Sequence, residues 1–274
     1  MYPTSVVDRY LTLSHPGFLR AISYAKTKTN KQDINNNMSF KNLAEYTFEN
    51  GFFWNNYKSI ESDFLRFLEY SPYHESNLKM YSPKLTGMLL QIGGYVDSAF
   101  KEMTSYFNPE AYDKKGNRKK KIIVNIKDVF CVFETIYNLS SNNRGTAVAK
   151  LDFGDLELYP FEEFSSQEFK SPAWWTAYNK VKHEYSLHYK KASMDNVLNG
   201  LAGAFLLNAI HYPSIKILWQ LGYLEAGMKT GTGFHGFEYR EKDIDDIIST
   251  AASEFKPVNI GLRIETPLFI YFHE

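Results

Sequence analysis

Apolar side chains recur at intervals of three and four residues in several parts of the chain, which is the spacing of one face of an α-helix. The longest such stripe follows Ser82-Pro83, which combines a capping hydroxyl with a proline suited to the first helical position. Its members are Leu85, Met88, Leu89, Ile92, Val96, Ala99, Phe100 and Met103. Within the stripe, Gly93-Gly94 lowers helix propensity but allows a neighbouring helix to approach closely. We predict a long helix that faces the core of a bundle.

Further helices are predicted in residues 5–24, in residues 59–70 and in a shorter stretch after Asp128, where the same spacing recurs. It also recurs in residues 193–211, where Ser193 is a suitable cap and apolar side chains cover most of the surface. A helix that is apolar on nearly all sides belongs at the centre of a bundle.

Strand patterns are short and few. Residues 121–126 alternate between apolar and polar side chains, and residues 149–159 do so on both sides of Gly154-Asp155, as in a hairpin. Residues 260–264 and 268–272 alternate near the C-terminus. The sequence therefore predicts a mainly α fold, a helical bundle with small β-hairpin appendages.

Polar and glycine-rich stretches divide the chain. Residues 26–39 are rich in Asn and read as a linker, and residues 113–121 form a basic loop. Glycine-rich residues 231–236 lack the Gly-Lys-Ser/Thr ending of a phosphate loop, so we expect a flexible loop there. The predicted parts are an N-terminal helix and linker, a bundle with an inserted hairpin, and a C-terminal extension with short strands, over residues 1–40, 41–211 and 212–274.

The charges of the chain balance, with 31 Lys and Arg against 31 Asp and Glu. Proteins that grip duplex nucleic acid by phosphate contacts alone carry a basic excess, so any such contact here must be a local patch. The single cysteine excludes a disulfide framework and suits a reducing cytoplasm. No histidine spacing indicates a metal, and we predict no cofactor. The chain shows neither a signal peptide nor an apolar run long enough for a membrane span.

Residues 171–189 combine aromatic and basic side chains in one predicted helix. Pro172 suits a helix start, and no helix breaker follows before Tyr189. Residues 170–191 contain five lysines, two histidines and one glutamate. At helical spacing, one face carries Trp174, Tyr178, Val181 and Tyr185, and the adjacent face carries Trp175, Asn179, Lys182, His183 and Ser186. We expect Asn179 and His183, which are four residues apart, to touch.

Residues 178–185, Tyr-Asn-Lys-Val-Lys-His-Glu-Tyr, resemble the signature helix of the HEPN superfamily (higher eukaryote and prokaryote nucleotide-binding domains). In many members that helix carries an arginine, a polar residue that is often Asn, three further residues and a histidine. In toxin members a tyrosine follows two positions after the histidine. Asn179, His183 and Tyr185 match this pattern, whereas Tyr178 stands in place of the arginine.

The resemblance implies a four- or five-helix bundle that pairs with a second copy about a two-fold axis. Active members are metal-independent endoribonucleases whose composite site lies at the dimer cleft. For this chain the resemblance therefore implies a homodimer that acts on RNA in a prokaryotic defence or toxin-type system, with an antitoxin or another defence protein as partner. Exposure of Trp175 beside polar groups, which we expect, also favours dimerisation.

The chemistry of metal-free RNA cleavage gives the matching residues roles. His183 is suited to act as general base or acid, because histidine titrates near neutral pH. Asn179 would orient His183 or hold a phosphate oxygen. Lys182 would supply the positive charge of the missing arginine, without its bidentate geometry. Asp97 matches an acidic residue that members carry on an earlier helix and would orient His183.

These residues also have ordinary structural explanations, as surface groups or as aromatic residues of the core or of a dimer interface. The presence of Asn179, His183 and Tyr185 together favours the ribonuclease. The replacement of arginine by Tyr178 favours a catalytically inactive HEPN-like module that binds RNA, a nucleotide or a partner protein. Both hypotheses stay open on the sequence alone.

Overall fold

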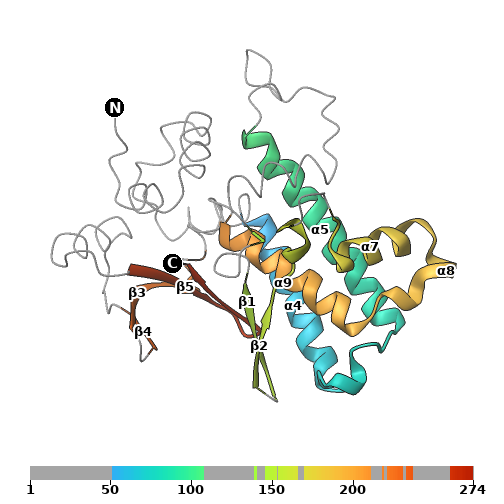
Figure 1. Ribbon diagram of the computed structural model, residues 1–274, viewed down its shortest axis with the longest axis horizontal. Helices are drawn as coiled ribbons and strands as arrows, with labels where there is room; N and C mark the ends of the chain where they lie inside the picture. Colours follow the sequence, from blue (N-terminus) through green and yellow to red (C-terminus); the bar gives the residue numbers. More distant parts are fainter. Residues whose placement is uncertain are drawn as a thin grey trace, which may run out of the picture.

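Four helices pack against one another in the computed structural model, and an antiparallel sheet lies beside them (Figure 1). The structure describes residues 51–107, 139–140, 146–152, 154–165, 170–210, 218, 221–230, 233–236 and 260–273. Helices predominate in this part of the chain, which confirms the prediction of a mainly α fold with a smaller β component.

The bundle is built around two central helices. Its members are α4 (Phe52–Leu68), α5 (Pro83–Phe107), α7 (Ala173–His183) and α9 (Met194–Ile210). α5 and α9 pack against each other, and each also contacts α4 and α7. The short helical segments are η1 (Glu75–Asn77), η3 (Glu162–Ser165), α8 (Tyr185–His188) and η4 (Tyr189–Lys191).

The two central helices begin where the sequence predicts. The Ser82 hydroxyl accepts a hydrogen bond from the Leu85 amide at 3.1 Å, and the Ser193 hydroxyl accepts one from the Asn196 amide at 3.3 Å. Every apolar position of the predicted α5 stripe up to Phe100 is buried. α9 is buried on nearly all sides, so its prediction as a central helix is confirmed.

The six strands of the described chain form one sheet rather than separate appendages. They are β1 (Ala147–Leu151), β2 (Gly154–Leu158), β3 (Leu224–Thr230), β4 (Gly233–Gly236), β5 (Ile260–Glu265) and β6 (Phe269–His273). Their order is β2-β1-β6-β5-β3-β4, and all neighbours are antiparallel. β1 pairs with β6, with Val148 opposite Ile270, and so joins the inserted hairpin to the C-terminal strands. The sequence predicted the hairpins but not their joining into one sheet, because pairing between distant strands has no local sequence signal.

The predicted hairpins are present, but the turn of one is shifted and a further strand, β4, was not predicted. β1 and β2 form the hairpin expected in residues 149–159, but the turn comes earlier, since Gly154 already pairs with Leu151. β5 and β6 form the expected C-terminal pair. Residues 233–236, expected in a flexible loop, form β4 instead, with Phe234 opposite Lys229 of β3. Glycine lowers strand propensity, but it does not prevent backbone pairing with a neighbouring strand.

A buried carboxylate ties the bundle to the turn between β5 and β6. Glu61 of α4 is fully buried and accepts hydrogen bonds from the Tyr57 hydroxyl at 2.9 Å and the Lys58 ammonium at 2.7 Å. It also accepts hydrogen bonds from the Thr266 hydroxyl and, at 3.3 Å, from the Leu268 amide. Burial, and then the charge of Glu61, raises the pKa of Tyr57 well above its ordinary value, so the phenol stays protonated as a donor. These donors offset the cost of burying the charge.

Several predicted elements lie outside the described residues. They are the helix of residues 5–24, the linker of residues 26–39, the basic stretch 113–121, the strand 121–126 and the helix after Asp128. No helix in the part of the chain that the structure describes has both the length and the apolar character needed to cross a membrane.

Candidate nucleic-acid interface

Helix α7 fits its first large aromatic side chain between glycines of α9. A Cβ added at Gly203 would come within 3.1 Å of the Trp174 ring, and one added at Gly200 within 3.2 Å. The Trp174 indole also donates a hydrogen bond to the carbonyl of Pro160, just after β2, at 2.8 Å. These contacts fix α7 tightly against the central helix.

Trp175 is buried as well, contrary to our expectation. It is 6% exposed, and its ring centroid lies 6.0 Å from that of Phe100 on α5 and 5.2 Å from that of Tyr178. Because α7 packs against both α5 and α9, two neighbouring faces of the helix meet the core rather than one. Trp175 was expected to be exposed, which is wrong, so it gives no support for dimerisation, and the homodimer rests on the resemblance alone.

Tyr178, which stands in place of the arginine of the resemblance, faces the core. It is 3% exposed, and its ring occupies the space beside Gly93 of α5, where an added Cβ would come within 2.1 Å of the ring. The predicted close approach of another helix at this glycine is confirmed. The position that resembles the family's arginine is thus filled by a packed aromatic ring, and its side chain does not reach the surface as a cation would need to.

The polar residues of the predicted site lie on the outer side of α7. His183, the last residue of the helix, is exposed. Asn179 is partly buried, and its amide donates a hydrogen bond to the Trp175 carbonyl at 3.0 Å. This hydrogen bond points back along the helix and away from His183. Asn179 therefore does not orient the imidazole by the contact that we expected.

Lys182 connects the outer side of α7 to the buried tyrosine. Its ammonium lies 5.3 Å from the centroid of the Tyr178 ring, and a hydrogen bond with Tyr178 is the main cause of its raised pKa. The negative charge of Asp97 on α5 raises this pKa further. Asp97 also forms a salt bridge with Lys101, one turn along α5. The predicted acid therefore acts on Lys182, and no contact with His183 is found among the described residues.

The predicted helix of residues 172–189 is interrupted after His183. Glu184 adopts φ −139° and ψ 65°, which ends α7, and α8 and η4 follow as separate turns. Tyr185 therefore leaves the apolar stripe of Trp174 and Tyr178 and is 52% exposed. Its assignment to that stripe is wrong, because a non-helical residue resets the direction of every side chain that follows.

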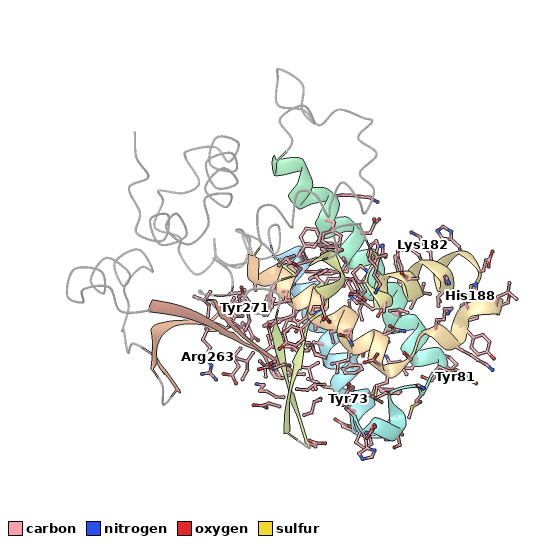
Figure 2. The ribbon with its side chains drawn as sticks, in the orientation of Figure 1. Tyr73, Tyr81, Lys182, His188, Arg263 and Tyr271 are labelled. Carbon is pink, nitrogen blue, oxygen red and sulfur yellow. The ribbon has the colours of Figure 1, made fainter. Side chains whose placement is uncertain are left out.

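Three exposed tyrosines gather at the end of the bundle away from β3 and β4, the end at which Figure 2 labels Tyr81. The Tyr189 ring lies 5.5 Å from the Tyr81 ring and 6.3 Å from the Tyr185 ring, measured between centroids. We call Tyr81, Tyr185 and Tyr189 the tyrosine cluster. Tyr81 and Tyr189 were not among the predicted site residues. The spacing of Tyr185 and Tyr189 was a usable signal for one pair, but nothing local connects Tyr81 to them.

The same end of the bundle is positively charged. Residues 180–191, which we call the basic segment, contain four lysines and a single acidic residue, Glu184. All four lysines are exposed. The Glu184 carboxylate lies 3.2 Å from the Nε2 atom of His188, so this acid is paired within the segment itself. The chain as a whole is neutral, so this is a local basic surface.

Among the described residues, no three His, Cys, Asp or Glu side chains come together as a metal site would require. No family model, no curated protein and no solved structure matches this chain. The likeness to the HEPN superfamily thus rests on the residues of the signature helix and on the helical character of the bundle around it.

Proposed function

We propose that this protein binds RNA through the basic segment. The observation that carries the proposal is the exposure of four lysines within twelve consecutive residues (180–191) of a chain with zero net charge. Lysine ammonium groups neutralise phosphates and so release the counterions condensed on the nucleic acid. A local group of lysines can therefore favour binding although the protein as a whole is neutral. The HEPN-like residues Asn179 and His183 lie on or beside this segment.

Support also comes from how the segment is held. α7 is fixed against α5 and α9 by Trp174, Trp175 and Tyr178, so the lysines at its C-terminal end project from a rigid element. The Lys182 ammonium also lies 5.3 Å from the centroid of the buried Tyr178 ring, and a hydrogen bond with Tyr178 raises its pKa. A fixed cation loses less conformational freedom when it meets a phosphate.

The test is binding of a fluorescently labelled RNA stem-loop, measured by anisotropy at several salt concentrations. The joint variant Lys180→Gln and Lys182→Gln should bind more weakly and lower the slope of log affinity against log salt by about one to two. Arg66→Gln is the matched control, because Arg66 on α4 is an exposed cation outside the segment. An intact protein that binds no RNA at low salt, or a control that behaves like the lysine variant, would contradict the proposal.

A second candidate function is metal-independent RNA cleavage, which the exposed His183 beside the cationic Lys182 favours. In this mechanism His183 removes the proton of a 2′-hydroxyl, and the 2′-oxygen forms a bond to the adjacent phosphorus. The bond to the 5′-oxygen breaks, and the 5′-oxygen takes a proton from the His183 imidazolium, which returns the histidine to its neutral form. Lys182 stabilises the negative charge of the intermediate. A second copy of the chain would complete the site, as the resemblance implies.

The products of such a reaction carry a 2′,3′-cyclic phosphate, and a chelator should not prevent their formation. His183→Ala should slow cleavage by about 10²–10⁴-fold, as expected for loss of a general base. His188→Ala is the matched control, because His188 lies in the same segment but is paired with Glu184. Equal cleavage by wild type and His183→Ala would exclude this mechanism. RNA binding without cleavage would leave the protein as a binding module.

A further inference from the structure

The geometry points to the tyrosine cluster as a stacking platform for the bases of single-stranded RNA, with the neighbouring lysines as phosphate contacts. This inference rests on the proposed RNA binding and specifies which form of RNA is bound and by which groups. It concerns Tyr81, Tyr185 and Tyr189, of which Tyr185 also belongs to the motif of the resemblance, where it would support the site.

The rings are accessible although they contact one another. Tyr81 is 43% exposed, Tyr185 52% and Tyr189 36%. They come from three different parts of the chain. Tyr81 precedes α5, Tyr185 begins α8, and Tyr189 begins η4. Tyr185 and Tyr189 are nearly parallel, with an angle of 30° between their planes, and Tyr81 meets Tyr189 edge-on at 74°. The uncovered part of each side chain is the surface on which we place a base.

The cluster is held by backbone contacts. Tyr81 forms a β-bridge with Ser193, and the Met194 amide donates a hydrogen bond to the Met80 carbonyl at 2.9 Å. Just after η4, the amide of the fully buried Ala192 donates a hydrogen bond to the Tyr189 carbonyl at 3.0 Å. The two stretches that carry Tyr81 and Tyr189 are therefore fixed side by side at the start of α9. A preorganised platform of this kind keeps the ordering cost of binding small.

Positive charge lies directly on the platform. The Lys190 ammonium is 5.6 Å from the centroid of the Tyr81 ring and 6.0 Å from that of Tyr189. Lys191 follows and is exposed. Aromatic faces interleaved with cations are what single-stranded nucleic-acid sites use, because bases stack on the rings while the backbone phosphates meet the cations.

A protein partner fits the surface less well. Interface cores are enriched in aromatic residues but depleted in lysine, and this surface places two lysines beside its three tyrosines. Its one exposed aliphatic side chain among residues 180–191 is Leu187. Duplex RNA fits less well because its bases are stacked on one another and cannot lie on a protein ring. The chemistry therefore selects single-stranded RNA.

The experiment compares three labelled probes of about twelve nucleotides, a length within the range that single-strand sites cover. They are a single-stranded RNA, the same RNA as a duplex, and a ribose-phosphate chain that lacks bases. The wild-type protein should bind the single strand most tightly. The joint variant Tyr185→Ala and Tyr189→Ala should weaken binding of the single strand by about five- to a hundredfold while leaving the base-free chain unaffected.

Two further variants keep the result interpretable. Tyr185→Phe with Tyr189→Phe retains the rings and should bind the single strand as the wild type does. Tyr70→Ala removes a tyrosine that is 85% exposed but lies outside the cluster, and it should change nothing. Unchanged thermal unfolding of all variants shows that each is folded, which the exposure of these rings leads us to expect.

The outcomes separate this inference from the proposed function. If the lysine variant loses RNA binding but the alanine tyrosine variant keeps it, the stacking platform is refuted and RNA binding by the basic segment stands. If the wild type binds none of the probes, the proposed function fails as well. If the alanine variant changes the molecular mass in light scattering but not the RNA affinity, the cluster is a protein interface and the inference is overturned.

Discussion

Two groups of aromatic residues lie within one stretch of sequence and have opposite surroundings. Trp174, Trp175 and Tyr178 of α7 are at most 6% exposed and contact helices α5 and α9. Tyr185 and Tyr189, only a few residues later, are 52% and 36% exposed. Both groups consist of large rings in contact with other rings, so residue type alone does not separate them.

What separates the two groups is the partner that each ring finds. Tyr178 lies against Gly93, and Trp174 lies against Gly200 and Gly203, so the buried rings fill spaces left by missing side chains on the neighbouring helices. The Lys190 ammonium lies 6.0 Å from the centroid of the exposed Tyr189 ring, and the Tyr185 ring lies against Tyr189. Rings that fill the space beside a glycine belong to the close-packed core, whereas Tyr185 and Tyr189 leave a large part of their surface uncovered.

The largest effect should come from placing the same charged side chain in each group. Tyr178→Arg should lower the free energy of unfolding by about 3–5 kcal/mol, because a guanidinium at this position loses its hydration and cannot fill the space beside Gly93 as the ring does. Tyr185→Arg should change it by no more than about 0.5 kcal/mol, as expected at an exposed site. Urea denaturation followed by circular dichroism measures both.

Tyr178→Arg also tests the resemblance to the HEPN superfamily. If the family's arginine had a place in this fold, Tyr178→Arg would be tolerated and would raise RNA cleavage. We expect unfolding instead, since the structure directs this position into the core. A stable, more active Tyr178→Arg protein would show that α7 lies differently from the packing described above.

An intermediate effect should distinguish two adjacent glycines. Gly93→Ala places a methyl group where the Tyr178 ring lies, and should destabilise the protein by about 1–3 kcal/mol through overpacking. Gly94→Ala meets no atom within 4 Å and should stabilise the protein by up to about 1 kcal/mol through higher helix propensity. Thermal unfolding of the two variants gives the comparison directly. Equal destabilisation by both would mean that propensity, not the contact with Tyr178, governs this part of α5.

The features that sequence analysis predicted well are those with local causes. The starts of α5 and α9 follow from Ser82 and Ser193, whose hydroxyls accept capping hydrogen bonds from the backbone. The burial of the α5 stripe follows from spacing, and the space at Gly93 follows from the absence of a side chain. The exposure of His183 and Lys182 also agrees with the polar character of their face.

The features that it missed depend on distant or single-residue events. The joining of β1 to β6 depends on residues more than a hundred positions apart, and Tyr81 meets Tyr189 over a similar separation. Trp175 was placed on the exposed face because periodicity cannot show that α7 has two neighbours. Glutamate is not a residue type that breaks helices, yet the backbone conformation of Glu184 ends α7 and turns Tyr185 outward.

The smallest effect should be found at the contact between Tyr178 of the buried group and Lys182 of the basic segment. Tyr178→Phe keeps the ring against Gly93 but removes the hydroxyl that hydrogen-bonds with Lys182, the main cause of the raised pKa of this lysine. In this variant the pKa of Lys182 should fall toward its ordinary value. Titration of its side-chain NMR signals in both proteins measures the change, and Lys180, an exposed lysine of the same helix, is the internal reference.

The effect on stability has a definite sign and pH range. Because folding raises the pKa of Lys182, the contact contributes fully to stability below the pKa of the unfolded chain, about 10.4 for lysine. Its contribution is lost as the pH rises through the higher pKa of the folded protein. Wild type and Tyr178→Phe should therefore differ slightly in unfolding free energy at neutral pH and converge in strongly alkaline solution. A pKa of Lys182 that is the same in both proteins would show that the hydroxyl is not its cause, and would leave only the ring to link the core to the basic segment.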